Sequence, residues 1–426
     1  MKAFLQKIDE YTEKHRLITV FLAIFLFFQP FRPYAGIRSA AFVTVLVLFS
    51  IRLIRGSAKI PFTNKAVQAL ILLAAVCLVS SLLGPYAIES LNAIRKNLLY
   101  QIVVFAVIVT EYRNFDEIKP LLFSIFAGFT ALSTIIIFKN SPSVLLHWLD
   151  RANKENIFLG GYSTHATFFI PLLTAYIFAF RRSPGKKAGL VAMLLLWVGL
   201  SFLNNHRTQI LAFGLAMFLI AALSRRYKAL IAGAVLCLAL IAALYGLKPE
   251  SFTRYKTLLN PYTYVTDNDE ALNGRLAIWR GTIDMIKVKP VLGYGYGWKK
   301  IASVAVDKGF LEKWNKNGAT YKYFSATSHG TTNPHNLVLQ ILFEIGIIGL
   351  CAFLLFWVVV IAKAVKAPLK EQNDEGRFLK YATAGVLLSY AVINITNGVW
   401  QEAMGVLIMA FAAFTVVLAK RQTETS

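Results

Sequence analysis

Apolar stretches long enough to cross a lipid bilayer recur along almost the whole of this 426-residue chain. A transmembrane helix needs about 17–25 mostly apolar residues in succession. Hydrophobic residues make up 57% of the sequence and charged residues only 16%, below the share of about 25% that is usual in soluble proteins. The sequence therefore predicts an all-α, polytopic membrane protein. We place about twelve transmembrane helices at residues 17–34, 38–54, 66–84, 98–112, 119–138, 162–180, 188–204, 208–224, 229–247, 336–362, 381–399 and 403–420.

Lysine and arginine are distributed unevenly between alternate loops. About 24 of them lie in the two tails and in the loops that share a side with the N-terminus, against about 8 in the short loops opposite. Because positive residues are retained on the cytoplasmic side, this asymmetry predicts that both termini are cytoplasmic. In a bacterium the protein would then lie in the inner membrane, with its opposite face in the periplasm. The net charge of +23 is mostly this topology signal, so no nucleic-acid partner is predicted.

One segment on the predicted outer side is far longer than the other loops. Residues 248–335 form a polar insertion with several tryptophans, many tyrosines and about 13 lysines and arginines. A long ordered insertion of this kind is often functional, and we expect a mostly helical periplasmic cap. The chain thus divides into residues 1–247 with nine spans, the cap at 248–335, and residues 336–426 with three spans and a cytoplasmic tail.

The sequence "TNPHNLVLQILFEIGIIGL" places a histidine at the entrance of a long apolar helix. Asn333 can serve as N-cap, with Pro334 at the first helical position and His335 at the second. There the positive end of the helix dipole would favour a neutral imidazole, the form that a general base requires. A capping or interfacial histidine is the alternative. Glu344, deeper in the same helix, is expected to be a packing residue or a member of a polar network.

Arg207 lies in the very short outer turn between two predicted spans. A charge so close to the hydrocarbon region usually faces a cavity or an anionic partner. The alternative is an arginine whose charged head reaches the lipid headgroups while its aliphatic part stays in the membrane.

The sequence "NGRLAIWRGTIDMIKVKPVLGYGYG" contains two further candidate arginines. Its spacing predicts an amphipathic helix over 275–288, capped by Asn273 and followed by a tight glycine-rich turn that approaches the bilayer. Arg275 would lie in the first turn, where it can help the helix N-terminus to bind an anion. Arg280 lies on a different face, and a solvated charged face is its alternative interpretation.

Metal and nucleotide motifs are missing from the sequence. It contains no HExxH, CxxC or Walker A pattern. The acids of "DNDE", residues 267–270, lack a clear second group of ligands. We therefore expect no metal and no cofactor. Arginines at membrane depth could instead stabilise a diphosphate leaving group, while a poorly nucleophilic sugar hydroxyl would need a base.

The three segments that carry Arg207, Arg275 and His335, over about residues 200–360, together resemble the O-antigen ligase family. This family is part of a wider ligase/polymerase superfamily of membrane glycosyltransferases. The resemblance implies a GT-C-like fold and metal-independent, inverting transfer from an undecaprenyl-diphosphate-linked glycan at the periplasmic face. It implies that Arg207 and Arg275 bind the diphosphate and that His335 is the base, with Arg280 a weaker match. The acceptor would be lipid A–core oligosaccharide, and no obligatory protein partner is inferred.

Three other functions fit parts of the same pattern. An O-antigen polymerase would extend the lipid-linked glycan, but such enzymes more often have two large outer loops. A protein O-glycosylating transferase usually has an additional C-terminal portion. A lipid-linked-glycan transporter could also use membrane arginines, and such proteins often contain inverted repeats. We see no such repeat in this sequence.

Overall fold

A computed structural model describes residues 2–140, 161–204, 206–247, 249, 274–325, 332–366 and 373–424 of the chain. Within these ranges the protein is built of helices and has no β-strand, so the predicted all-α class is confirmed. The longer helices that match the predicted spans are α2 (Leu17–Phe27), α3 (Ala35–Arg55), α4 (Lys65–Leu83), α6 (Leu99–Glu111), α7 (Phe115–Lys139), α9 (Tyr162–Ala179), α10 (Pro184–Leu203), α11 (Arg207–Leu223), α12 (Tyr227–Leu247), α18 (Leu337–Lys366), α19 (Asp374–Asn394) and α20 (Glu402–Glu424). The shorter elements are α1 (Lys2–Lys14), η1 (Arg32–Tyr34), α5 (Ala87–Ala93), η2 (Ile94–Leu98), α14 (Arg275–Val288), η5 (Trp298–Lys300), α15 (Ile301–Asp307), α16 (Phe310–Lys313) and α17 (Ala319–Phe324).

Every predicted span overlaps a helix, and seven helical segments of the described chain are long and apolar enough to cross a membrane. Two shorter apolar helices, α2 and α11, accompany them. The outward faces of the long helices carry large apolar side chains, such as Leu83 of α4, Phe138 of α7 and Val358 of α18. Because such surfaces are unfavourable in water, they indicate contact with lipid, and the polytopic membrane class is confirmed.

Several predicted span boundaries are wrong, for identifiable reasons. The first span is shorter than 17–34, because α2 ends at Phe27 shortly before two prolines, Pro30 and Pro33. The span expected at 98–112 is longer, since helix already begins at Ala87 and continues through η2 into α6. The span expected at 381–399 begins earlier, where Asn373 accepts a 2.9 Å hydrogen bond from the N–H of Glu375.

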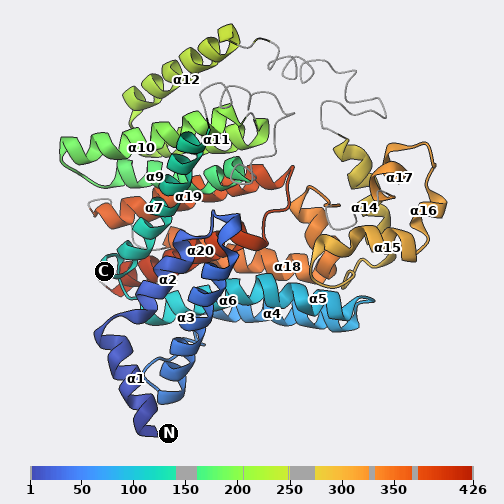
Figure 1. The fold of residues 1–426 in the computed structure, drawn as a ribbon, viewed down its shortest axis with the longest axis horizontal. Coiled ribbons are helices and arrows are strands. Elements are labelled where there is room, and N and C mark those ends of the chain that lie inside the picture. Colours follow the sequence, from blue (N-terminus) through green and yellow to red (C-terminus); the bar gives the residue numbers. More distant parts are fainter. Residues whose placement is uncertain are drawn as a thin grey trace.

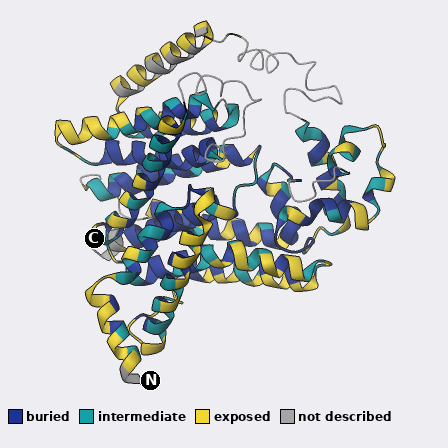
Figure 2. Ribbon diagram, viewed as in Figure 1, coloured by how far each residue is buried: buried dark blue, intermediate teal, exposed yellow. Residues whose placement is uncertain are grey.

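Burial divides the helices into inner and outer ones (Figure 2). In α20, 89% of the apolar window is buried, against 28% in α3 and α10. The central α9 is buried along nearly its whole length and packs against α11 and α19. This arrangement explains how α9 tolerates Pro171 and several hydroxyl side chains, because neighbouring protein rather than lipid surrounds them.

The short helices α14–α17, residues 274–325, form a separate cluster at one end of the long helices (Figure 1). Its small core contains Ile278, Met285, Tyr294, Phe310 and Phe324. Both chain ends lie at the side away from this cluster (Figure 1). The rest of the predicted cap, including Asn273 and the "DNDE" acids, lies outside the described residues, and the three-part domain division remains a prediction.

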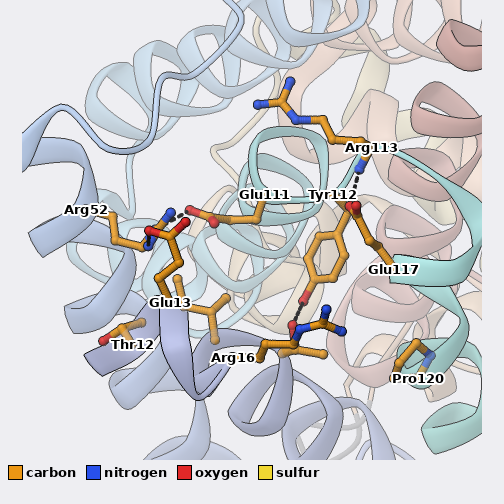
Figure 3. Close-up of a pocket in the computed structure, with 11 residues that line it drawn as sticks. Thr12, Glu13, Arg16, Arg52, Glu111, Tyr112, Arg113, Glu117 and Pro120 are labelled. Carbon is orange, nitrogen blue, oxygen red and sulfur yellow. Dashed lines mark hydrogen bonds and ion pairs between the residues drawn. The ribbon is translucent and has the colours of Figure 1, made fainter. Parts of the chain in front are cut away.

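The N-terminal helix α1 is attached to the bundle by one buried arginine. Arg52 on α3 forms ion pairs with Asp9 at 3.2 Å, Glu13 at 3.5 Å and Glu111 at 3.1 Å. Figure 3 shows Arg52, Glu13 and Glu111 pointing toward one another at the edge of a pocket of about 390 Å³. The three carboxylates come from α1 and α6, so the arginine connects three helices.

Candidate functional site

The backbone turns sharply at His335, immediately before α18 begins. His335 has a φ of 51°, in the left-handed region that residues other than glycine seldom adopt. The side-chain oxygen of Asn333 accepts a 2.7 Å hydrogen bond from the N–H of His335. Asn336 then caps α18, since its side-chain oxygen accepts a 3.0 Å hydrogen bond from the N–H of Leu339. The predicted register, with Asn333 as N-cap and His335 inside the helix, is therefore wrong.

Arg275 is the first residue of α14, and its charge acts on His335. Burial of the imidazole and the positive charge of Arg275 together lower the pKa of His335 to about 4. Both effects disfavour imidazolium, because burial removes its hydration and a like charge repels it. The ring is therefore neutral at pH 7 and able to accept a proton. The expected neutral state is retained, but its causes differ from the helix-dipole argument.

Tyr323 on α17 holds the segment before His335 in place. Its hydroxyl accepts a 3.0 Å hydrogen bond from the N–H of Asn333 and donates a 2.9 Å hydrogen bond to the carbonyl of the same residue. Burial raises the pKa of Tyr323, while the bond to Asn333 and the charge of Arg275 oppose that rise. Arg275 is therefore electrostatically coupled to both rings. Nothing in the sequence distinguishes Tyr323 from the other 17 of the 18 tyrosines.

The helix that carries Arg275 has the predicted bounds, Arg275–Val288, but a different cap. Gly274, with a φ of 72°, precedes it as N-cap. Ile283, an apolar residue of this helix, is 39% exposed. A close contact is made at Gly281, where an added Cβ would lie 2.5 Å from the Phe324 ring of α17. Small size at this position lets α14 and α17 approach each other.

A glycine-rich turn after α14 inserts into a break in α18. Gly346 interrupts α18 with φ 64° and ψ −167°. Four backbone hydrogen bonds then join the turn to the broken helix: Tyr294 N–H to Phe343 (2.9 Å), Gly295 N–H to Glu344 (2.7 Å), Ile347 N–H to Pro290 (2.8 Å) and Ile348 N–H to Val291 (3.4 Å). The predicted tight turn is thus present, and its function in the fold is to satisfy backbone groups that the break leaves open.

Glu344 is fully buried just before this break, and both carboxylate oxygens have donors. The donors are Gln340 Nε2 (2.7 Å to Oε1), Gln401 Nε2 (2.9 Å to Oε1 and 2.7 Å to Oε2) and the Gly297 N–H (2.9 Å to Oε2). Of the two roles expected for Glu344, membership of a polar network is therefore confirmed. The network joins α18, the turn after α14 and the segment that connects α19 to α20. Glu344 lies nine residues further along the chain than His335.

Lys300 extends this network from the opposite side. Its Nζ donates hydrogen bonds to the carbonyls of Tyr296 at 2.8 Å and Gly297 at 2.7 Å. Burial lowers the pKa of Lys300 to about 8, while the nearby charge of Glu344 acts to raise it. Sequence reasoning missed Lys300, although it precedes buried Val304 by about one helical turn and so falls on the same face.

The remaining predicted arginines occupy different positions. Arg207 is the first residue of α11, which packs against α9 and α19. The other end of α11 shares a pocket with Arg377 at the start of α19, so these two helices run in opposite directions. Arg207 therefore lies toward the end of α19, where the Ile395 carbonyl accepts a 3.1 Å hydrogen bond from Asn336. Arg280 lies on α14 and is exposed.

No cluster of three or more potential metal ligands occurs among the residues that the structure describes. What the site offers is a neutral imidazole beside a guanidinium, supported by a rigid network. This combination can accept a proton and bind an anion at neighbouring positions.

Residues 188–354 match a protein family described as O-antigen ligase. That range contains Arg207, Arg275, Arg280 and His335. A Rickettsia felis protein named "Putative polysaccharide ligase" is 33% identical over 129 residues, 30% of this chain and 27% of that protein. A Rickettsia conorii protein of similar name is 33% identical over 128 residues, with the same shares covered. A Rickettsia typhi protein is 30% identical over 130 residues. The chain thus spans 27% of the length of these relatives.

Proposed function

Since residues 188–354 match a family described as O-antigen ligase, we propose that the protein is an O-antigen ligase. It transfers an O-antigen glycan from undecaprenyl diphosphate to a sugar hydroxyl of lipid A–core oligosaccharide. The observation that carries the proposal is the pairing of neutral His335 with Arg275 inside the family-matched range. Each of the two groups suits one of the two demands of the reaction, which are a base for the acceptor and a cation for the leaving group.

The proposed reaction is a single displacement at the anomeric carbon. The acceptor hydroxyl oxygen forms a bond to that carbon while the bond to the diphosphate oxygen breaks, so the configuration inverts. His335 takes the hydroxyl proton, and the electron pair of the broken bond leaves with undecaprenyl diphosphate. Arg275 and Arg207 bind the diphosphate and stabilise its growing negative charge. Arg280, exposed on α14, has a secondary role in attracting the same group.

Donor binding would also adjust the strength of the base. In the structure the charge of Arg275 helps to hold the pKa of His335 at about 4, which makes a weak base. A diphosphate bound to Arg275 would offset that positive charge and so raise the pKa of His335 toward its ordinary value near 6.5. The imidazole would become a better proton acceptor only when the donor is in place. Because of this coupling, the acceptor hydroxyl would be activated for transfer only after the donor has bound.

The proposed membrane placement is supported by the arrangement of the helices. The α14–α17 cluster lies away from both chain ends (Figure 1). With the basic loops on the cytoplasmic side, the cluster and His335 face the periplasm of the inner membrane. There the lipid-linked donor and the lipid-anchored acceptor could both reach the site laterally from the bilayer.

The test is product formation by purified protein in proteoliposomes, with lipid-linked glycan and lipid A–core supplied and ATP and metal omitted. Transfer of the glycan onto the core supports the ligase. Lengthening of the glycan on its undecaprenyl carrier would instead identify a polymerase. Movement of the intact lipid-linked glycan between leaflets, without a new glycosidic bond, would identify a transporter.

A further inference from the structure

A strongly basic pocket of about 460 Å³ lies at the opposite ends of the helices from His335. It is formed where α9 ends, α10 begins, α11 ends and α19 begins. Because α11 begins with Arg207, this pocket and the candidate catalytic site are separated by the length of that helix. The proposed transfer reaction makes no use of it.

Five cationic side chains and no acidic ones are among the residues that line this pocket in the described chain. They are Arg181, Arg182, Lys187, Arg226 and Arg377. The Asp374 carboxylate forms an ion pair with Arg377 and accepts a 3.3 Å hydrogen bond from the backbone N–H of Arg181. The residues that line the pocket still carry a positive excess.

Two of the arginines are held in position by the protein. Arg182 donates a 2.6 Å hydrogen bond to the Tyr176 hydroxyl, and its guanidinium carbon lies 5.3 Å from the centre of the Phe180 ring. Arg377 donates hydrogen bonds of 3.3 and 3.2 Å to the carbonyl of Ala179. These contacts hold two guanidinium groups in fixed positions, one just after α9 and one at the start of α19, which reduces the entropic cost of binding an anion.

The other three cations are exposed. Arg181 lies just beyond α9, Lys187 in the first turns of α10, and Arg226 just before α12. Over the described ranges, none of the three has a side-chain ion pair within 4 Å. Apolar Ile177 and Phe178 of α9 also line the pocket. An apolar wall beside a basic rim suits a ligand with a charged head and an apolar body.

We propose that this pocket binds a phosphate group, with an anionic phospholipid of the surrounding membrane as its natural source. Guanidinium groups match phosphate oxygens through paired hydrogen bonds, which a single ammonium cannot provide. Basic pockets at the ends of transmembrane helices are suited to anionic lipid headgroups. The pocket joins four helix ends, so a bound headgroup would hold α9, α10, α11 and α19 together at this side.

The test measures binding of phosphatidylglycerol to the full-length protein in detergent, by native mass spectrometry and by the shift of Tm. Phosphatidylcholine and inorganic phosphate serve as separate arms. The test variant combines Arg181→Gln, Lys187→Gln and Arg226→Gln, which are all exposed and leave the two fixed arginines intact. The matched control combines Arg55→Gln, Lys59→Gln and Lys65→Gln, which remove three exposed cations at helix ends on the same side.

Phosphatidylglycerol should raise the Tm of the wild type and of the control, while phosphatidylcholine should not. Affinity should fall on the order of 100-fold in the test variant, at about fivefold for each cation near an anionic headgroup. Saturable displacement of the lipid by inorganic phosphate would support the same site with a soluble phosphate as ligand. Equal weakening in both triple variants, or equal binding of both lipids, would overturn the proposal. The Tm of each lipid-free variant reports whether folding is intact.

Discussion

The positive charge of Arg275, the first residue of α14, lowers the pKa of His335, which lies 60 residues later in the sequence and immediately before α18. Two features hold this pair together. Tyr323 fixes the segment that precedes His335, and the turn after α14 is hydrogen bonded into the break of α18. The neutral state of the candidate base is therefore a property of the packed cap, and each element of that packing can be tested separately.

Replacing Arg275 by methionine should raise the pKa of His335. The neighbouring cation would be lost, but the pKa should stay below 6.5, because burial is the larger cause of the shift. An NMR titration of protein labelled at its histidines would measure the change, with the resonance assigned by its loss in His335→Gln. Arg280→Met, on the exposed face of the same helix, is the matched control. An unchanged pKa in Arg275→Met would contradict the coupling.

The depressed pKa also predicts an acid-sensitive stability. In the unfolded chain His335 titrates near 6.5, and in the folded protein near 4, so the unfolded state binds more protons between these values. Titration of His335 therefore does not reduce the free energy of unfolding above about pH 6.5. It lowers this free energy increasingly as the pH falls from 6.5 toward 4. Tm measured from pH 7 to pH 4.5 should therefore fall more in the wild type than in His335→Gln. Parallel curves would show that His335 has no such effect.

Gly346 should tolerate no side chain. A Cβ there would lie 2.1 Å from the carbonyl oxygen of Val291, and the φ of 64° is unfavourable for other residues. With ψ at −167° this backbone conformation is essentially restricted to glycine and costs another residue on the order of 1–3 kcal/mol, to which the clash adds. Gly346→Ala should lower Tm and displace the turn after α14. Gly214→Ala, in α11 with open space around its Cβ position, should leave Tm equal or slightly higher. Similar behaviour of the two variants would be inconsistent with a packed break.

Glu344 should matter chiefly for its buried charge and its acceptor oxygens. Glu344→Leu would leave three donor groups without an acceptor and would remove the larger of the two negative charges that act on buried Lys300. We expect a loss of stability on the order of 3 kcal/mol, since breaking a buried ionic network by removing one member is strongly destabilising. Glu344→Gln keeps one acceptor oxygen and the shape, and should lose less. The free energy of unfolding in mixed micelles measures both, and an equal loss would mean that volume alone is important.

The sequence predicted the parts of this molecule that depend on local patterns. Apolar length located the twelve helices, and helical spacing gave the bounds of α14 correctly. The isolation of Glu344 in an apolar helix indicated a polar network as one of its two expected roles. In each of these cases the signal lies within a few turns of chain, where periodicity and burial cost act directly.

Features that depend on contacts distant in sequence were not predictable in this way. The sequence "NPHN" led to Asn333 as the expected cap, whereas Asn336 is the residue that caps α18 after the segment held by Tyr323. The break at Gly346 required knowledge that the segment at 290–295 supplies its hydrogen bonds. Lys300 and Gln401 joined the Glu344 network through the same tertiary contacts. The approach of Arg275 to His335 likewise depends on how the cap folds back onto α18.

The central claim is that His335 removes the proton from the acceptor hydroxyl, and single-turnover transfer by His335→Ala tests it most directly. Donor affinity is measured in the same preparation by binding of lipid-linked glycan. The control is His15→Ala, at an exposed histidine just after α1. We expect His335→Ala to bind donor as the wild type does and to lose about 10²- to 10⁴-fold in transfer rate, the usual contribution of a general base. Transfer at the wild-type rate by folded, donor-bound His335→Ala would contradict the account.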